Sequence, residues 1–277
     1  MPDRAPTRSG RLQDLPARVA TAAIFVVVII GVLLFGRELG WALLVAAITV
    51  LSLREFYALT RETRLLPNEI LGLAAAAAMP LAAIFFGKLG LLTAVTAFVL
   101  AALAWYVAFR QVPLADTAVT VLGVMYVAFG LTHLVLVRAL DAGALLVLTI
   151  LLSVWAADVF AYFVGSLLGR HKLAPSISPG KSWEGFAGGI LGSVLVWVAA
   201  SQVSDTGLGP AWHVAIGIAV AVAGLLGDLL ESRIKREVGV KDSGTMLPGH
   251  GGFLDRFDSL IIVAVVAYYM LVWGGAS

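Results

Sequence analysis

The stretch DRFDSLIIVAVVAYYMLVW, residues 255–273, joins a charged tetrapeptide to fifteen consecutive uncharged residues. An apolar run of this kind provides most of the roughly 20 residues that a helix needs to cross a bilayer. Charged side chains are costly to dehydrate beside lipid, so Asp255, Arg256 and Asp258 need specific partners there. The stretch therefore predicts a transmembrane helix with a functional site at its start.

The composition of the whole chain also indicates a membrane protein. Hydrophobic residues make up 60% of the 277 residues and charged residues 13%, whereas soluble domains contain roughly 45–50% and about 25%. No cysteine is present, which excludes disulfides, thiolate metal sites and cysteine nucleophiles. We predict an all-α polytopic membrane protein with about nine transmembrane helices. The apolar runs lie near 19–36, 39–53, 70–87, 89–109, 117–137, 143–168, 185–203, 211–230 and 259–273.

The basic residues predict the orientation of these spans. With the N-terminus inside and nine crossings, 16 of the 19 Lys and Arg residues fall in cytoplasmic segments, and only Arg37, Lys88 and Arg138 fall outside. This bias satisfies the positive-inside rule and predicts a C-terminus outside.

The net charge of +2 gives no reason to expect a nucleic-acid partner. No cleavable signal peptide is expected. The predicted organisation is a polar cytoplasmic segment at 1–18, an N-terminal transmembrane bundle of about five spans at 19–140 and a catalytic transmembrane region of about four spans at 141–277.

The cytoplasmic loop between the last two spans concentrates charged and glycine residues. If residues 228–236 extend the eighth helix, Asp228, Ser232 and Lys235 share one face, with Arg236 beside them. Asp255 and Asp258 would begin the ninth helix at a spacing of three. We therefore expect carboxylates and cations from two helix ends to meet at the membrane surface.

These residue types suit polyphosphate chemistry. Carboxylates are the ligands that Mg²⁺ prefers, lysine and arginine neutralise phosphoryl charge, and glycines let backbone amides approach phosphate oxygens. A structural alternative stays open for each residue: Asp255 and Asp258 could cap the helix, Lys235 and Arg236 could set the topology, and His250 could be an ordinary loop residue.

A second polar stretch follows the sixth span. Asp158 lies within that span, where a carboxylate needs a cation or a hydrogen-bond partner; a buried polar link to Tyr162 or to another helix is the structural alternative. Gly165 and Gly169 form a GxxxG pair that predicts close helix packing. Ser182 can cap the seventh span, with Glu184 in its first turn. Lys181 is a cation at a helix start, which the helix dipole disfavours unless an anion binds there.

Residues 232–258, SRIKREVGVKDSGTMLPGHGGFLDRFD, resemble the signature of the CDP-diacylglycerol synthases, or phosphatidate cytidylyltransferases. SPGKSWEG, residues 178–185, resembles the family's Ser-Pro-x-Lys-Thr-x-Glu-Gly element, with Ser182 where threonine is commoner. The resemblance covers roughly residues 155–260, and the first 140 residues share only a series of spans. The agreeing positions of the longer motif are Ser232, Lys235, Arg236, Lys241, Asp242, Pro248, His250, Gly251, Gly252, Asp255, Arg256 and Asp258.

The resemblance implies that CTP and phosphatidate react to give CDP-diacylglycerol and pyrophosphate in a Mg²⁺-dependent reaction. It implies metal binding by Asp228 and Asp255, K⁺ as a possible second ion and a homodimer; Asp258 and Asp158 are further candidate metal ligands. The catalytic candidates are Asp228, Lys235, Asp255 and Arg256. The candidates for nucleotide or phosphate binding are Ser232, Lys235, Arg236, Lys241, His250, Gly251 and Gly252. Weaker candidates for the lipid phosphate or the nucleotide are Ser178, Lys181, Ser182 and Glu184.

A phosphate oxygen of the lipid is already an anion, so its attack on the α-phosphorus of CTP needs charge neutralisation more than a base. We expect the site on the cytoplasmic side of a bacterial inner membrane, where CTP and a bilayer lipid can meet. Two alternatives stay open. One is a related lipid phosphoryl or cytidylyl transferase, such as a polyprenol kinase or a CDP-archaeol synthase. The other is a cation-coupled transporter, with Asp158 and Asp228 on its path.

Overall fold

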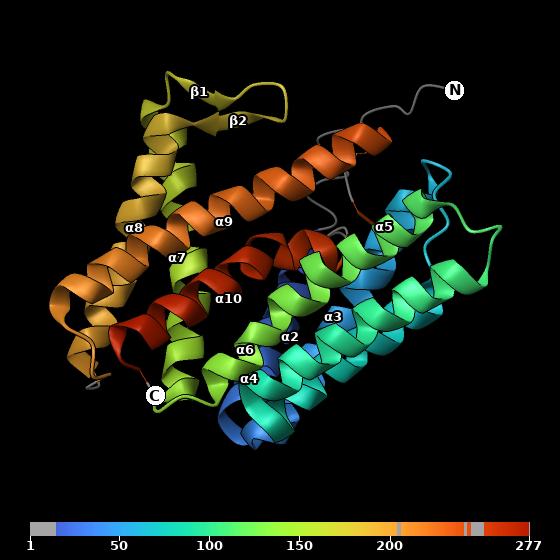
Figure 1. The fold of residues 1–277 in the computed structure, drawn as a ribbon. Coiled ribbons are helices and arrows are strands. Elements are labelled where there is room, and N and C mark those ends of the chain that lie inside the picture. The colour runs from blue at the N-terminus through green and yellow to red at the C-terminus, as the bar shows by residue number, and fades with distance from the viewer. Residues whose placement is uncertain (1–14, 204–205, 241–242, 245–251, 277) are drawn as a thin grey trace.

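The computed structural model describes residues 15–203, 206–240, 243–244 and 252–276, with side chains from residue 23 onward. These residues form a bundle of helices and one small hairpin (Figure 1). The elements are α2 (Leu15–Phe35), α3 (Arg37–Arg61), α4 (Glu69–Ala108), α5 (Leu114–Gly123), the π-helical segment η1 (Val124–Phe129), α6 (Gly130–Arg138), α7 (Gly143–Leu168), β1 (Lys172–Ala174), β2 (Ser178–Ser182), α8 (Trp183–Val203), α9 (Pro210–Val238) and α10 (Leu254–Gly274).

The all-α membrane fold is confirmed. Within the described residues, seven helices are long and apolar enough to cross a membrane, counting α5, η1 and α6 as one helix, and α2 adds a shorter apolar segment, Ala23–Phe35. The sequence did not predict the hairpin, in which β1 and β2 pair antiparallel with Lys172 opposite Ser182. Two strands this short add little to the core. They form the connection between α7 and α8.

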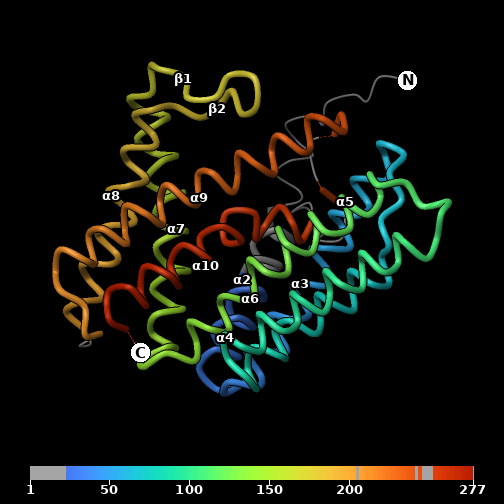
Figure 2. The backbone as a smooth tube through the Cα atoms, viewed as in Figure 1, coloured from blue at the N-terminus to red at the C-terminus, as the bar shows by residue number. Residues whose placement is uncertain are grey.

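Helix α4 is two helical segments joined by a sharp reversal. Gly87 has φ 59° and ψ −142°, a conformation that favours glycine, and a Cβ on Gly90 would overlap the carbonyl oxygen of Ala82. The segments before and after α4 lie close together. The amide of Asn68, just before α4, donates to Thr120 Oγ1 in α5 at 2.8 Å. Both loops flanking α4 accordingly lie at the same end of the bundle (Figures 1 and 2). The reversal coincides with the predicted boundary between the third and fourth spans.

Helices α7 and α8 run side by side, and the hairpin lies at one end of the pair (Figures 1 and 2). A stripe of glycines on α8 allows this close approach. A Cβ added at Gly185, Gly189 or Gly192 would lie 2.9, 3.2 or 2.7 Å from a backbone oxygen of α7. Gly165 on α7 faces Gly185, so the predicted packing role of Gly165 is confirmed.

The last two helices carry the charged motif as the sequence predicted. Helix α9 is 29 residues long, about 44 Å at 1.5 Å per residue, which exceeds the roughly 30 Å of a bilayer core. It includes Asp228 to Arg236 and ends at Gly239, which has φ 79°. Helix α10 begins at Leu254 and packs against α9, α6 and α3. It therefore joins the C-terminal helices to the N-terminal bundle.

Candidate functional site

A cavity of about 520 Å³ lies between α7, α8, α9 and the hairpin. Its polar lining includes Asp158, Ser178, Lys181, Ser182 and Asp228, which were all candidates from the sequence. Its remaining lining is mainly apolar and continues along α7 from Ser166 to Val154, about 18 Å at 1.5 Å per residue. The cavity therefore joins a polar end to a long apolar wall.

Asp228 and Lys181 form an ion pair at the polar end of this cavity. The Lys181 Nζ lies 2.5 Å from Asp228 Oδ2, and the two side chains are 23% and 35% exposed. The other carboxylate oxygen accepts a hydrogen bond from Ser232 Oγ at 3.1 Å. The predicted pairing of Asp228 with Ser232 across one helix turn is confirmed. In this structure the negative charge next to Lys181 is the carboxylate of Asp228, and the predicted binding of an anion at Lys181 stays a prediction.

Two further carboxylates lie near this pair. Asp158 lines the large cavity and a second one of about 310 Å³, and Lys181 is within electrostatic range of it. Asp258 lines the second cavity and interacts electrostatically with Asp228. Among the described residues, Asp158 makes no hydrogen bond to Tyr162, the structural alternative considered for it. Asp158 and Lys181 both line the large cavity.

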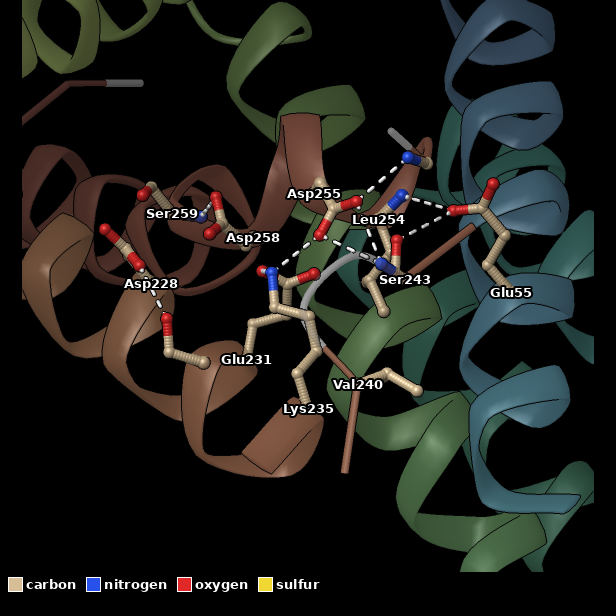
Figure 3. A network of polar contacts seen from close by, with 12 residues as sticks. Glu55, Asp228, Glu231, Lys235, Val240, Ser243, Leu254, Asp255, Asp258 and Ser259 are labelled. Carbon is tan, nitrogen blue, oxygen red and sulfur yellow. Dashed lines mark hydrogen bonds and ion pairs between the residues drawn. The ribbon is translucent and has the colours of Figure 1, made fainter. Parts of the chain in front are cut away.

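Asp255 lies in a separate and more enclosed cluster (Figure 3). Its Oδ1 accepts from Lys235 Nζ at 2.6 Å, and its Oδ2 accepts from the amides of Ser243 and Gly252 at 3.0 and 2.9 Å. The same ammonium donates to Glu231 Oε2 at 2.8 Å. The side chains of Lys235, Asp255 and Glu231 are 12%, 8% and 1% exposed. Lys235 therefore neutralises two buried carboxylates. It is more enclosed than Asp228, although both residues lie on the predicted face of α9, two turns apart.

The remaining sequence candidates are placed as follows. Ser182 Oγ accepts from the amide of Gly185, so its capping role is confirmed. The Glu184 carboxylate turns back to the amides of Arg170 and His171 and lies 2.6 Å from His171 Nδ1, which ties the start of α8 to the turn after α7. Arg236 donates to the carbonyl of Val240 at 3.3 Å, and Arg256 lines the second cavity. Five motif positions lie outside the described residues: Lys241, Asp242, Pro248, His250 and Gly251.

The residues around Asp228 fit a hard divalent cation. The carboxylate is partly exposed to the cavity and already binds one positive group, the Lys181 ammonium. Carboxylate oxygens with room for water and phosphate oxygens are the usual surroundings of Mg²⁺. Among the described residues, no three Asp, Glu or His side chains are close enough to enclose a metal ion. Such an ion would therefore depend on substrate oxygens or on side-chain movement for the rest of its shell.

Two buried carboxylates of this region were missed from the sequence. Glu231 lies between Asp228 and Lys235 on α9, and Glu55 on α3 contacts the loop before α10 (Figure 3). Both lie in or beside apolar helices, where a carboxylate usually has a specific role. Glu55 and Glu231 follow the predicted spans at 39–53 and 211–230, so the rule that drew attention to Asp158 did not single them out.

Comparisons with known proteins identify relatives of the whole chain. A family model described as "Cytidylyltransferase family" matches residues 16–273. A phosphatidate cytidylyltransferase of Mycobacterium bovis is 32% identical over 282 residues, a match that covers 96% of this chain and 90% of the relative.

Two further relatives match more strongly over a shorter region. The phosphatidate cytidylyltransferases of Staphylococcus epidermidis and Bacillus subtilis are 43% and 40% identical over 157 and 151 residues. These matches cover 57% and 54% of this chain, and 60% and 56% of the relatives. The chain therefore matches less than two thirds of the length of these two proteins.

Proposed function

This chain belongs to the cytidylyltransferase family, and we propose that it condenses CTP with phosphatidate to give CDP-diacylglycerol and pyrophosphate. The observation that carries the proposal is the large cavity, whose polar end holds the Lys181–Asp228 pair and whose apolar wall follows α7. A lipid phosphate and its acyl chains need such a combination of surfaces in one continuous site. The activities named for the relatives support the same reaction.

The lipid side of the proposal assigns phosphatidate to the large cavity. Tyr162 lines this cavity and is 72% exposed, and the neighbouring Phe163 and Leu167 of α7 are also exposed. An exposed apolar helix face beside the cavity would let acyl chains enter from the bilayer. Lys181 and Ser178 would then contact the lipid phosphate, since both line the polar end.

In the proposed reaction, a phosphate oxygen of the lipid forms a new bond to the α-phosphorus of CTP. The bond between this phosphorus and the oxygen that links it to the β-phosphate breaks. Pyrophosphate leaves with that oxygen and with the electron pair of the broken bond. Both reactants are anions, so neighbouring cations stabilise the transition state by reducing their repulsion. Lys181 would supply this charge on the lipid side, and Ser232, Arg236 and Arg256 remain candidates for the triphosphate. Lys235 would act by positioning Asp255, because its ammonium is held between two carboxylates.

We propose that the reaction uses Mg²⁺, held by Asp228 and Asp255 with Asp258 and Asp158 as further candidates. The ion would supply positive charge next to the phosphate groups. Asp228 supports this proposal through its open carboxylate, which lines the cavity and binds a lysine ammonium at 2.5 Å. Asp255 enters it through the family resemblance, and an ion there would have to replace contacts that its oxygens make with Lys235 and two loop amides. A second ion such as K⁺ belongs to the same proposal.

The finer topology also belongs to the proposal. We propose nine crossings with the N-terminus and the site on the cytoplasmic side of a bacterial inner membrane. The reversal at Gly87 supports two crossings within α4, and the inside bias of Lys and Arg supports the orientation. A homodimer is carried over from the family resemblance, and crosslinking in native membranes would test it.

The test of the reaction is the fate of labelled phosphorus. Purified protein would be given Mg²⁺, phosphatidate and CTP labelled in either its α- or its γ-phosphate. The proposal expects the α-label in the lipid product and the γ-label in pyrophosphate. Transfer of the γ-label to the lipid would instead identify a lipid kinase. Ion flux in vesicles without nucleotide turnover would favour the transporter alternative.

A further inference from the structure

Glu55 is a buried carboxylate that the proposed reaction does not use. It lies on α3, in the N-terminal bundle, and is 4% exposed. It is 188 residues from Ser243 and 199 residues from Leu254 in the sequence, yet it contacts both (Figure 3). Dehydrating a carboxylate at such a position is costly, so its contacts indicate a specific role.

The contacts of Glu55 hold both ends of the loop between α9 and α10. Its Oε2 accepts the amide of Leu254 at 2.9 Å and the hydroxyl of Ser243 at 3.2 Å. Two glycines permit this approach: a Cβ at Gly244 would lie 2.8 Å from Glu55 Oε1, and a Cβ at Gly252 would overlap Oε2. One carboxylate oxygen therefore joins two points of the loop that are 11 residues apart in the chain.

Asp255 binds the same loop ends from the other side. It accepts the amides of Ser243 and Gly252, at 3.0 and 2.9 Å, and the ammonium of Lys235. Ser243 thus donates its amide to Asp255 and its hydroxyl to Glu55. A displacement of the loop away from Glu55 would change the surroundings of Asp255 directly.

We propose that Glu55 is a positioning residue that fixes the start of α10, and with it Asp255, against the N-terminal bundle. In this way α3 contributes a hydrogen-bond acceptor to the site. The effect on the reaction rests on the proposed function, whereas the effect on the loop does not.

The geometry distinguishes an acceptor role from a charge role. Both hydrogen bonds of Glu55 end on Oε2, and among the described residues Oε1 has no hydrogen-bond partner. A glutamine can keep a carbonyl oxygen at the Oε2 position and retain both bonds. An alanine loses both bonds, and an aspartate is one methylene too short to reach the loop. Glu55→Gln is therefore the conservative variant, and Glu55→Ala and Glu55→Asp are the disruptive ones.

The test combines hydrogen exchange at the Leu254 amide with the kinetics of pyrophosphate release from CTP. We expect Glu55→Ala to speed exchange at Leu254 by about 10-fold to 100-fold, the range that corresponds to losing a hydrogen bond to a charged group. We expect its kcat to fall by about tenfold, while the KM for phosphatidate changes less, because all but one of the residues that line its cavity lie on α7, α8, α9 and the hairpin. Glu55→Gln should recover most of both properties. The matched control is Ser52→Ala, one turn earlier on α3, which removes a buried hydroxyl that has no hydrogen-bond partner among the described residues.

Ser243→Ala provides a second route if Glu55→Ala does not fold. It removes one of the two bonds and should raise the exchange rate at Leu254 less than the alanine at position 55. Unchanged exchange in both variants would overturn the proposal. Equal damage from Glu55→Gln and Glu55→Ala would also overturn it, because the charge rather than the acceptor would then matter. A wild-type protein that releases no pyrophosphate would contradict the proposed function alone, since the exchange measurement does not depend on activity.

Discussion

The two lysine–carboxylate pairs of the site have the same chemistry in different surroundings. Lys181 and Asp228 line the large cavity and are 23% and 35% exposed. Lys235 and Asp255 are 12% and 8% exposed and are bonded to Glu231 and to loop amides. Ions exposed to a cavity can exchange partners with a ligand, whereas enclosed ions that are fully hydrogen-bonded stabilise one conformation. The first pair, the cavity pair, is therefore suited to substrates, and the second, the loop pair, to positioning.

Removing the charge of Asp228 is the most severe change to the cavity pair. We expect Asp228→Asn to lower kcat for pyrophosphate release by about 10³-fold, the upper range for losing one preorganised electrostatic group. The fold should be retained, because the amide can still accept from Ser232. Glu38→Gln, at an exposed carboxylate in the first turn of α3, is the matched control. Near-normal activity of Asp228→Asn would remove Asp228 from the proposed metal site.

Neutralising the lysine of the loop pair should mainly affect stability. Lys235→Met leaves Glu231 and Asp255 without their shared cation, and breaking a buried pair in this way costs about 3–5 kcal/mol. The measurement is thermal unfolding in detergent. The double variant Lys235→Met/Glu231→Gln should regain part of the loss, because it removes one of the two stranded charges. A Tm equal to that of the wild type would contradict the enclosed character of this pair.

The same substitution in the cavity pair should show the opposite pattern. Lys181→Met is expected to lower kcat/KM for phosphatidate by about 10²-fold, because the lipid phosphate loses its nearest cation. Its Tm should change little, since Asp228 keeps access to the cavity and to Ser232. Lys172→Met, an exposed lysine on β1 of the same hairpin, is the control. If the control lost as much activity as Lys181→Met, the general charge of the hairpin would explain the effect.

We expect the smallest effect at Glu184, which belongs to neither of the two lysine–carboxylate pairs. Its carboxylate holds the amides of Arg170 and His171 and thereby the entry to the hairpin. Glu184→Gln keeps one acceptor oxygen, so we expect a loss of activity smaller than that of Lys181→Met and no change in nucleotide preference. Activity with CTP, ATP and GTP would be measured. A change in preference would indicate that Glu184 contacts the nucleotide.

The sequence predicted the parts of this fold that depend on local patterns. Apolar runs located the helices, including the break in α4 near Gly87, and Ser182 and Asp255 were placed correctly at helix starts. The hairpin was missed because each of its strands is very short and lacks the alternation of apolar and polar residues that indicates a strand.

Long-range contacts explain what could not be predicted of the site. The charged residues of α9 and α10 were found through their motif, but the division into two lysine pairs depends on long-range contacts: Asp228 meets the hairpin, and Lys235 meets the start of α10. Similarly, Glu55 resembled any polar residue near the end of a span until α3 was seen to pack against the start of α10. Sequence spacing gives no information about contacts between residues 199 positions apart.

The most direct test of the two roles is to measure activity and stability together in Lys181→Met and Lys235→Met. Phosphatidate-dependent pyrophosphate release from CTP and the Tm would be determined on the same preparations, beside the wild type. The predicted result is a large loss of activity at an unchanged Tm for Lys181→Met, and a clearly lowered Tm for Lys235→Met. Full activity in Lys181→Met, together with an unchanged Tm in Lys235→Met, would contradict the division between a substrate pair and a positioning pair.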